Sequence, residues 1–319
     1  MSDFRPLPLL GNPHIQTLLS NLLPAPALPG LTTIHHVDLA DGQRLLAYDT
    51  APPRWRPGQP IAVLVHGLGG NHQSPIVCRV SRRLLDKGLR IVRLDLPSCG
   101  KGIALSRRPY DAGSSHDVRA VLELAHRWSP TSPLFLLGVS LGGNIVLKLA
   151  GEAAAQPVPG LQRVVAVAPP IDLERCCDLI CQPRNRLYEL NFLRELLDLV
   201  RRRERCFPDM PRTRFPRSMT LRQFDELYTA PRGGHASAQE YYRRSSSLPL
   251  IPEIRVPTLI LTARDDPFIV TAPFESLAAP AHVEVRILNR GGHLGFLGWD
   301  DGWDFFWGDR RVIDWVTRP

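Results

Sequence analysis

Ser140 is the residue whose surroundings most clearly suggest chemistry, because it is the serine of a G-x-S-x-G motif at residues 138–142. A short apolar, strand-like segment precedes the motif, and a helix-like segment follows it. In a sharp turn from strand to helix, flanking glycines such as Gly138 and Gly142 prevent backbone clashes and leave the serine hydroxyl exposed. The motif in this context predicts a nucleophile rather than an ordinary glycine-rich turn.

A serine nucleophile needs a base and an acid that orients the base. His293 follows the last predicted strand and has glycines on both sides, which leave its ring room to reach another loop. Asp265 and Asp266 come directly after the predicted strand 257–263. The chain order is therefore serine, acid, histidine, which is the order of α/β-hydrolases. In that fold the acid often lies three residues beyond a small residue that closes the strand; Ala263 favours Asp266, with Asp265 as the alternative.

Donors for a developing oxyanion are expected from two turns. His66, Gly67 and Leu68 follow the third predicted strand and resemble the turn that supplies one amide in hydrolases of this type. The backbone amides of Leu68 and Leu141 would then hold the oxyanion. We expect His66 to be structural and not the base, because it precedes the nucleophile and lies within the oxyanion turn.

The elements that must position these residues alternate along the chain. A hairpin is predicted at 33–39 and 43–50, joined by an Asp-Gly turn. The later strand-like segments lack polar alternation, as do strands buried on both faces of a parallel sheet; they are 61–67, 89–96, 133–138, 161–169, 257–263 and 282–288. Predicted helices lie between them at 75–87, 114–128, 141–155, 271–279 and 309–317. This alternation predicts an α/β-hydrolase fold, with a mostly parallel central sheet and helices on both faces.

The alternation is interrupted at residues 172–250. Three helical segments are predicted there, at 184–203, at 218–230 with Ser218 or Thr220 as the N-cap, and at 237–247. We therefore expect a core formed by residues 1–171 and 251–319, with residues 172–250 inserted as a helical cap over the ends of the strands.

Composition narrows the function classes. The chain has 319 residues, a formal net charge of +8, and 44% hydrophobic residues, which suits one large globular unit with an insertion. The arginines are dispersed apart from a run between 201 and 217, and no nucleic-acid motif accompanies them. Nucleic-acid binding is therefore not expected, while the run leaves contact between the cap and an anionic membrane surface as an alternative.

No cofactor or metal is expected. The sequence lacks a dinucleotide fingerprint, a P-loop and an HExxH motif. Cys176, Cys177 and Cys181 cluster without a CxxC pair or a nearby histidine, so the thiols are expected to be reduced rather than bound to zinc. The N-terminal segment is interrupted by prolines, and no apolar stretch is long enough for a membrane span, which predicts a soluble, cytoplasmic protein.

Several longer motifs resemble the AB-hydrolase-4 family, the YheT-like branch of the α/β-hydrolases. In chain order they are GNPHIQT (11–17), HGLGG (66–70), GVSLGGN (138–144), FDELYTAP (224–231), YYRRSSS (241–247), ARDDPF (263–268) and GGHLGF (291–296). The resemblance covers nearly the whole chain. It implies a triad of Ser140, one of the two adjacent aspartates, and His293, with esterase- or lipase-type substrates. The loop at 94–102 departs from the arginine-glycine-rich turn of relatives.

Together, these features predict a serine hydrolase that cleaves small-molecule or lipid carboxylic esters, with short to medium acyl chains, through an acyl-enzyme on Ser140. An acyltransferase or thioesterase with the same triad is the first alternative. A lipid-binding protein with a vestigial site is the second. Within the motifs, Asp225 and Tyr228 are expected to be a packing or hydrogen-bonding pair, and His14 is expected to be structural.

Overall fold

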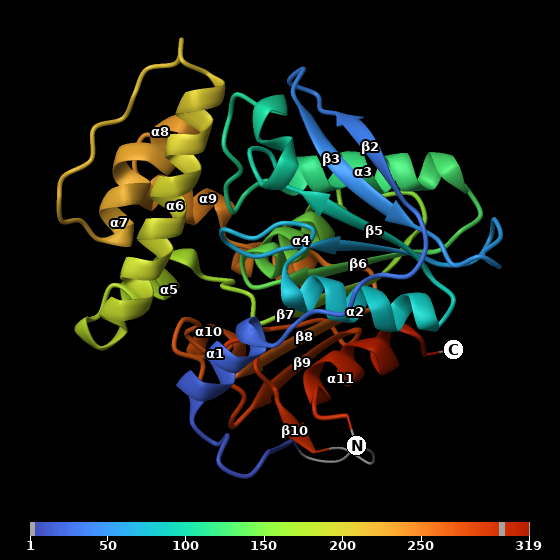
Figure 1. The fold of residues 1–319 in the computed structure, drawn as a ribbon. Coiled ribbons are helices and arrows are strands. Elements are labelled where there is room, and N and C mark those ends of the chain that lie inside the picture. The colour runs from blue at the N-terminus through green and yellow to red at the C-terminus, as the bar shows by residue number, and fades with distance from the viewer. Residues whose placement is uncertain (1–3, 300–303, 319) are drawn as a thin grey trace.

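A computed structural model describes residues 4–299 and 304–318. Its centre is an eight-stranded sheet with the strand order β2-β3-β5-β4-β6-β7-β8-β9 (Figure 1). The strands are β2 (Thr32–Asp38), β3 (Arg44–Thr50), β4 (Ile61–Val65), β5 (Arg90–Asp95), β6 (Leu134–Val139), β7 (Leu161–Val167), β8 (Thr258–Ala263) and β9 (Val283–Leu288). β3 is antiparallel to both of its neighbours, β2 and β5. The strands β5, β4, β6, β7, β8 and β9 are parallel to one another. The predicted hairpin and the mostly parallel sheet are confirmed.

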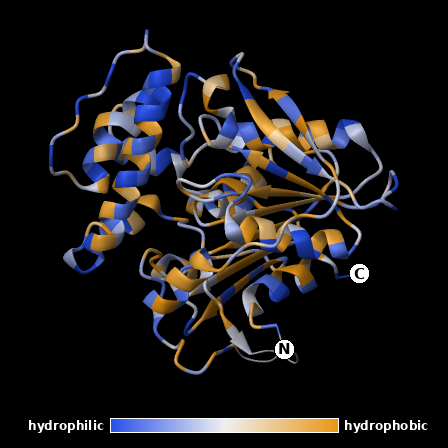
Figure 2. Cartoon of the chain, viewed as in Figure 1, coloured by the Kyte–Doolittle hydropathy of each residue, from blue (hydrophilic) through white to orange (hydrophobic). Residues whose placement is uncertain are grey.

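Helices cover both faces of this sheet. α2 (Pro75–Asp86) packs against α11 (Trp307–Val316), and α3 (Ser115–Trp128) packs against α4 (Leu141–Glu152). The central strands are apolar along their length (Figure 2), and every residue of β4, β6 and β8 is buried. Strands enclosed by two helical layers gain the full hydrophobic stabilisation of both faces, which explains why they lack polar alternation.

The segment between β7 and β8 is helical and lies beside the sheet, at the left of Figure 1. Its elements are α5 (Leu173–Ile180), η2 (Pro183–Asn185), α6 (Arg186–Cys206), α7 (Leu221–Phe224), the π-helical turn η3 (Asp225–Thr229), α8 (Ala230–Arg232), α9 (Ala238–Ser245) and η4 (Leu248–Glu253). These helices enclose a small apolar core of their own, which includes Leu193, Phe224 and Tyr242. Thr220, not Ser218, caps α7, in a capping box with Gln223.

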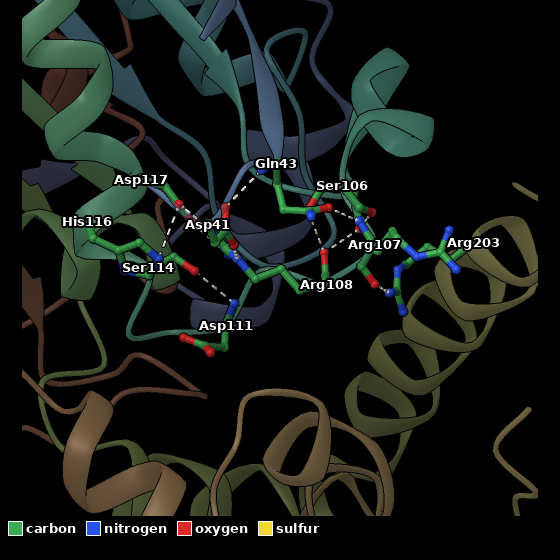
Figure 3. A network of polar contacts seen from close by, with 11 residues as sticks. Asp41, Gln43, Ser106, Arg107, Arg108, Asp111, Ser114, His116, Asp117 and Arg203 are labelled. Carbon is green, nitrogen blue, oxygen red and sulfur yellow. Dashed lines mark hydrogen bonds and ion pairs between the residues drawn. The ribbon is translucent and has the colours of Figure 1, made fainter. Parts of the chain in front are cut away.

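A polar network attaches α6 to the sheet (Figure 3). Arg203 of α6 donates to the backbone oxygen of Arg107 and to the hydroxyl of Tyr228. The neighbouring Arg108 forms ion pairs with Asp41, in the turn between β2 and β3, and with Asp117 of α3. The loop that carries Arg107 and Arg108 is therefore bonded to the inserted helices on one side and to the sheet and α3 on the other.

Two sequence expectations differ from the structure. The helix expected at 271–279 is only α10 (Ala272–Glu275), which ends with the amide of Ser276 donating to the backbone oxygen of Ala272. The sequence Asn12-Pro13 suggests a rigid turn, whereas in the structure it begins α1 (Pro13–Leu22). The Asn12 side chain accepts bonds from two first-turn amides, and proline is favoured at the first helical position. Two short strands, β1 (Arg5–Pro6) and β10 (Gly298–Trp299), form a further antiparallel pair.

Candidate active site

Ser140 lies at the turn from β6 into α4 in a strained backbone conformation, with φ of 51° and ψ of −124°. A positive φ at a non-glycine residue costs on the order of 1–3 kcal/mol and must be held by its surroundings. The Ser140 amide donates to the oxygen of Val167, 2.8 Å away, which fixes the turn to β7. This backbone conformation keeps the serine side chain out of the helix and directs it toward a cavity that Ser140 lines.

The motif glycines make this turn sterically possible. A Cβ on Gly138 would lie 2.2 Å from the backbone oxygen of Gly142, within the turn itself. A Cβ on Gly142 would lie 2.4 Å from the backbone oxygen of His66, at the end of β4. Neither position can hold a side chain without moving backbone, so both glycines are required by close approach.

His293 is brought to Ser140 by the loop after β9. Its Nε2 lies 2.9 Å from Ser140 Oγ, and its Nδ1 lies 2.8 Å from Asp266 Oδ2. Because a carboxylate only accepts, Nδ1 carries the hydrogen and Nε2 accepts the serine hydroxyl. All three residues expected for the triad are thus joined by hydrogen bonds in the order needed to deprotonate a serine.

The structure separates the two adjacent aspartates. The side chain of Asp266 is fully buried, and its second oxygen accepts from the amides of Phe268 and Ile269. Asp265 instead accepts from the amide of Gly292, which supports the histidine loop. Burial and the neighbouring Asp266 carboxylate raise the pKa of Asp265. Asp266 is therefore the residue that contacts the imidazole, and Asp265 braces the backbone that carries it.

His66 has both ring nitrogens occupied. Its Nε2 accepts from the amide of Leu96, and its Nδ1 donates to the oxygen of Gly67. Complete burial lowers the pKa of His66, which keeps the ring neutral. This ring fixes the turn that carries Leu68 and has no free nitrogen to act as a base.

The two amides expected to hold the oxyanion are near the nucleophile. Leu68 and Leu141 both line the same cavity as Ser140, and a Cβ on Gly67 would lie 3.0 Å from the Cβ of Ser140. Among the hydrogen bonds of residues 4–299 and 304–318, none uses the amide of Leu68 or Leu141. Both donors remain available to a ligand, as an oxyanion site requires.

The cavity above Ser140 has a volume of about 490 Å³ and is mostly apolar. Side chains of the inserted helices form much of its wall, among them Phe192, Leu196 and Phe224. Three carboxylates, Asp111, Glu195 and Asp225, are among the residues that line it, and none of its described lining residues is an arginine or a lysine. A cavity of this size and character can hold a small or medium apolar group near the serine.

Among the described residues, Asp225 and Tyr228 have different hydrogen-bond partners. Asp225 accepts from the hydroxyls of Thr229 and Tyr242, whereas Tyr228 accepts from Arg203. Burial raises the pKa of Asp225 to about 6 despite these hydrogen bonds. Both residues line the cavity, so they contribute to its wall as well as to the packing of the inserted helices.

Two supporting residues were missed from the sequence. Thr17 of α1 accepts the His293 amide at its Oγ1, at 2.9 Å, so the GNPHIQT segment holds the histidine loop. Tyr110 accepts the amide of Gly69 at 2.8 Å and thereby supports the turn before it. His14 contacts Tyr188 of α6, with 3.0 Å between His14 Nδ1 and the hydroxyl, and does not line the cavity.

No cluster of three metal-ligating side chains occurs in the part of the chain that the structure describes. Within the same residues, no helix is both long enough and apolar enough to cross a bilayer.

Comparisons with known proteins agree with this geometry. The alpha/beta hydrolase family model matches residues 62–306. YheT of Escherichia coli (strain K12), named as an esterase, is 30% identical, and the alignment covers 99% of this chain and 93% of that protein. Medium-chain fatty acid ethyl ester synthase/esterase 2 of Saccharomyces cerevisiae is 25% identical over 81% of this chain, which spans 62% of the yeast protein.

Among solved structures, the Pyrococcus furiosus esterase Pf2001 superposes with a TM-score of 0.58 at 12% identity, over 92% of this chain and 98% of that one. This likeness concerns the fold alone. The family match over most of the chain, and the YheT alignment over nearly all of it, settle the relationship: the chain belongs to the alpha/beta hydrolase family, in its YheT-like branch.

Proposed function

We propose that this protein is a serine esterase that cleaves carboxylic esters through an acyl-enzyme on Ser140. The observation that carries the proposal is the continuous set of hydrogen bonds from Ser140 through His293 to Asp266. The esterase- and lipase-type names of its relatives support the same class of activity.

The reaction follows from the roles of these atoms. Ser140 Oγ attacks the ester carbonyl while His293 Nε2 takes its proton, and the Asp266 carboxylate stabilises the imidazolium. The amides of Leu68 and Leu141 hold the oxyanion, and each such donor lowers the barrier by roughly 3 kcal/mol. His293 then protonates the leaving alcohol, water attacks the acyl-enzyme, and the acid is released.

The cavity favours a neutral, apolar acyl group. Its wall is mostly apolar, and its lining carboxylates would repel an anionic substrate, since none of the described residues that line the cavity is an arginine or a lysine that could offset their charge. We therefore assign short- and medium-chain esters, or lipid esters, as substrates. Residues 172–250 act as the cap in this proposal, because their side chains complete the cavity that receives the acyl chain.

An acyl-enzyme can also be attacked by an alcohol, which would make the protein an acyltransferase. The yeast relative named as an ethyl ester synthase as well as an esterase favours this as the second candidate function. The two activities differ only in which acceptor reaches the acyl carbonyl.

A series of p-nitrophenyl esters of increasing chain length tests the proposal. We expect kcat/KM to be highest for short to medium chains and to be lost in the Ser140→Ala variant. With ethanol present, the ratio of ethyl ester to free acid measures transfer against hydrolysis. Ester cleavage that persists in Ser140→Ala would contradict the assigned nucleophile.

A further inference from the structure

Helix α1 buries a face of three polar side chains and exposes a face of three apolar ones. Gln16, Thr17 and Ser20 are buried against the protein. On the opposite side, Ile15, Leu18 and Leu22 are 39%, 51% and 75% exposed. Surface helices of globular proteins normally show the reverse arrangement, so the outer face of α1 requires an explanation.

Specific bonds fix the helix in this orientation. The Gln16 side-chain amide donates to the backbone oxygens of Leu10 and Leu297. Thr17 accepts a hydrogen bond from the amide of His293, and the buried Arg79 donates to the backbone oxygen of Ser20. Because these bonds hold the polar side inward, the leucines on the other side stay in contact with solvent in the isolated chain.

The exposed leucines lie at the mouth of the cavity. Leu18 and Leu22 both line the cavity while remaining largely exposed. The first turns of α6 adjoin this point, because the imidazole of His14 stacks on Tyr188 with ring centroids 5.7 Å apart. On α6, Leu187 and Leu190 precede and follow Tyr188 in the sequence and are 83% and 46% exposed. We call the set Ile15, Leu18, Leu22, Leu187 and Leu190 the apolar rim.

Charge around the apolar rim is predominantly positive. Residues 4–31 contain one arginine and no aspartate or glutamate. Arg184 and Arg194 are exposed on either side of the rim leucines of α6, and Arg290 is exposed beside Gly11 at the start of α1. One acidic residue near this end of α6, Glu195, is also exposed; it lines the cavity, and its carboxylate accepts a hydrogen bond from Asn191. An apolar surface bordered by cations is complementary to an anionic lipid surface.

We propose that the apolar rim docks on an anionic lipid surface and opens the cavity directly onto the lipid. Docking would bury the exposed leucines and place ester-bearing chains at the mouth of the cavity that leads to Ser140. The inference deepens the proposed esterase function and rests on it for the identity of the delivered substrate. It uses a surface other than the arginine run at 201–217, where Arg203 is buried and bonded to Tyr228.

Vesicle sedimentation tests the docking without catalysis. The Ser140→Ala protein is mixed with vesicles of phosphatidylglycerol and phosphatidylcholine in equal parts, and with vesicles of phosphatidylcholine alone. We expect strong sedimentation with the first and weak sedimentation with the second. Adding Ile15→Gln and Leu187→Gln, neither of which lines the cavity, should weaken binding at least about tenfold, since each removes a side chain that would enter the lipid.

A matched control changes two similarly exposed residues outside the rim, Ile34 and Leu227, which are 49% and 43% exposed. Ile34→Gln with Leu227→Gln should leave vesicle binding unchanged. The docking inference is overturned if the Ser140→Ala protein does not sediment with anionic vesicles, or if the rim variant binds as well as the control. It is equally overturned if light scattering shows a dimer that the rim variant converts to a monomer.

Hydrolysis of the soluble ester p-nitrophenyl butyrate separates the two proposals. With Ser140 restored, the rim variant should cleave this ester at the wild-type rate and lose activity only on esters embedded in vesicles. Cleavage of the soluble ester without vesicle binding would refute docking and leave the esterase intact. Vesicle binding without any ester cleavage would refute the esterase and leave docking intact.

Discussion

Replacing Asp266 with asparagine is predicted to remove nearly all activity, and the reason lies in its two acceptor sites. One carboxylate oxygen accepts from His293 Nδ1, and the other accepts from the amides of Phe268 and Ile269. An asparagine has one acceptor and one donor group. If its oxygen keeps the two amides, its NH2 faces Nδ1, and the hydrogen of the imidazole moves to Nε2. A histidine in that tautomer cannot take the proton of Ser140.

The opposite orientation of the asparagine is also unfavourable. Its NH2 would then face two buried amide donors, and each unsatisfied buried group costs about 1–3 kcal/mol. The first orientation, in which the imidazole hydrogen lies on Nε2, should therefore dominate. The same change in a serine triad lowers kcat about 10⁴-fold, or about 5.4 kcal/mol. We expect a loss of this size in Asp266→Asn, measured as kcat on p-nitrophenyl butyrate.

Asp265→Asn is the matched control. Asp265 accepts a hydrogen bond from the amide of Gly292, and an asparagine oxygen can accept the same bond. Activity should stay within about tenfold of wild type, because no proton-transfer step involves this side chain. If Asp265→Asn were the inactive variant and Asp266→Asn the active one, the assignment of the acid would be wrong.

Three further predictions follow from single positions. Gly142→Ala should abolish soluble expression or activity, because its Cβ would lie 2.4 Å from the backbone oxygen of His66; a normally folded, active variant would contradict the close approach. Thr17→Val should lower kcat/KM about tenfold, because it removes the hydrogen bond to the His293 amide and leaves that donor unsatisfied, at a cost of roughly 1–3 kcal/mol. Thr17→Ser keeps the hydroxyl and should retain activity. Equal activity of both variants would refute the positioning role of Thr17. Burial raises the pKa of Asp225 from 3.8 to about 6. Asp225 therefore adds roughly 3 kcal/mol to the free energy of unfolding below about pH 4, and this contribution is lost as the pH rises through about 6. In Asp225→Asn, the free energy of unfolding measured with denaturant should not show this decrease. Parallel pH profiles for the variant and wild type would refute the raised pKa.

The arrangement around Ser140 could be predicted because each part of it is encoded locally. The glycines at 138 and 142 can be recognised within one turn, and the strand before them is a continuous apolar run. The acid and the base each follow a strand, and the carboxyl ends of parallel strands meet at one edge of the sheet. Strand positions therefore determined which polar residues would meet.

The residues that support this arrangement could not be predicted, because their contacts join segments that lie far apart in the sequence. Helix α1 carries its leucines outward, so apolar periodicity gave no sign that its polar side packs against the protein. The bond from His293 to Thr17 joins residues 276 positions apart, and no local pattern marks such a contact. Asp225 and Tyr228 share a motif, yet a π-helical turn directs them to different partners.

Covalent labelling tests the central claim most directly. The wild-type protein is treated with a fluorophosphonate, digested, and analysed by mass spectrometry to locate the adduct. The account predicts one adduct, on Ser140, that is absent in Ser140→Ala and forms far more slowly in Asp266→Asn. An adduct on another residue, or labelling that survives in Ser140→Ala, would contradict it.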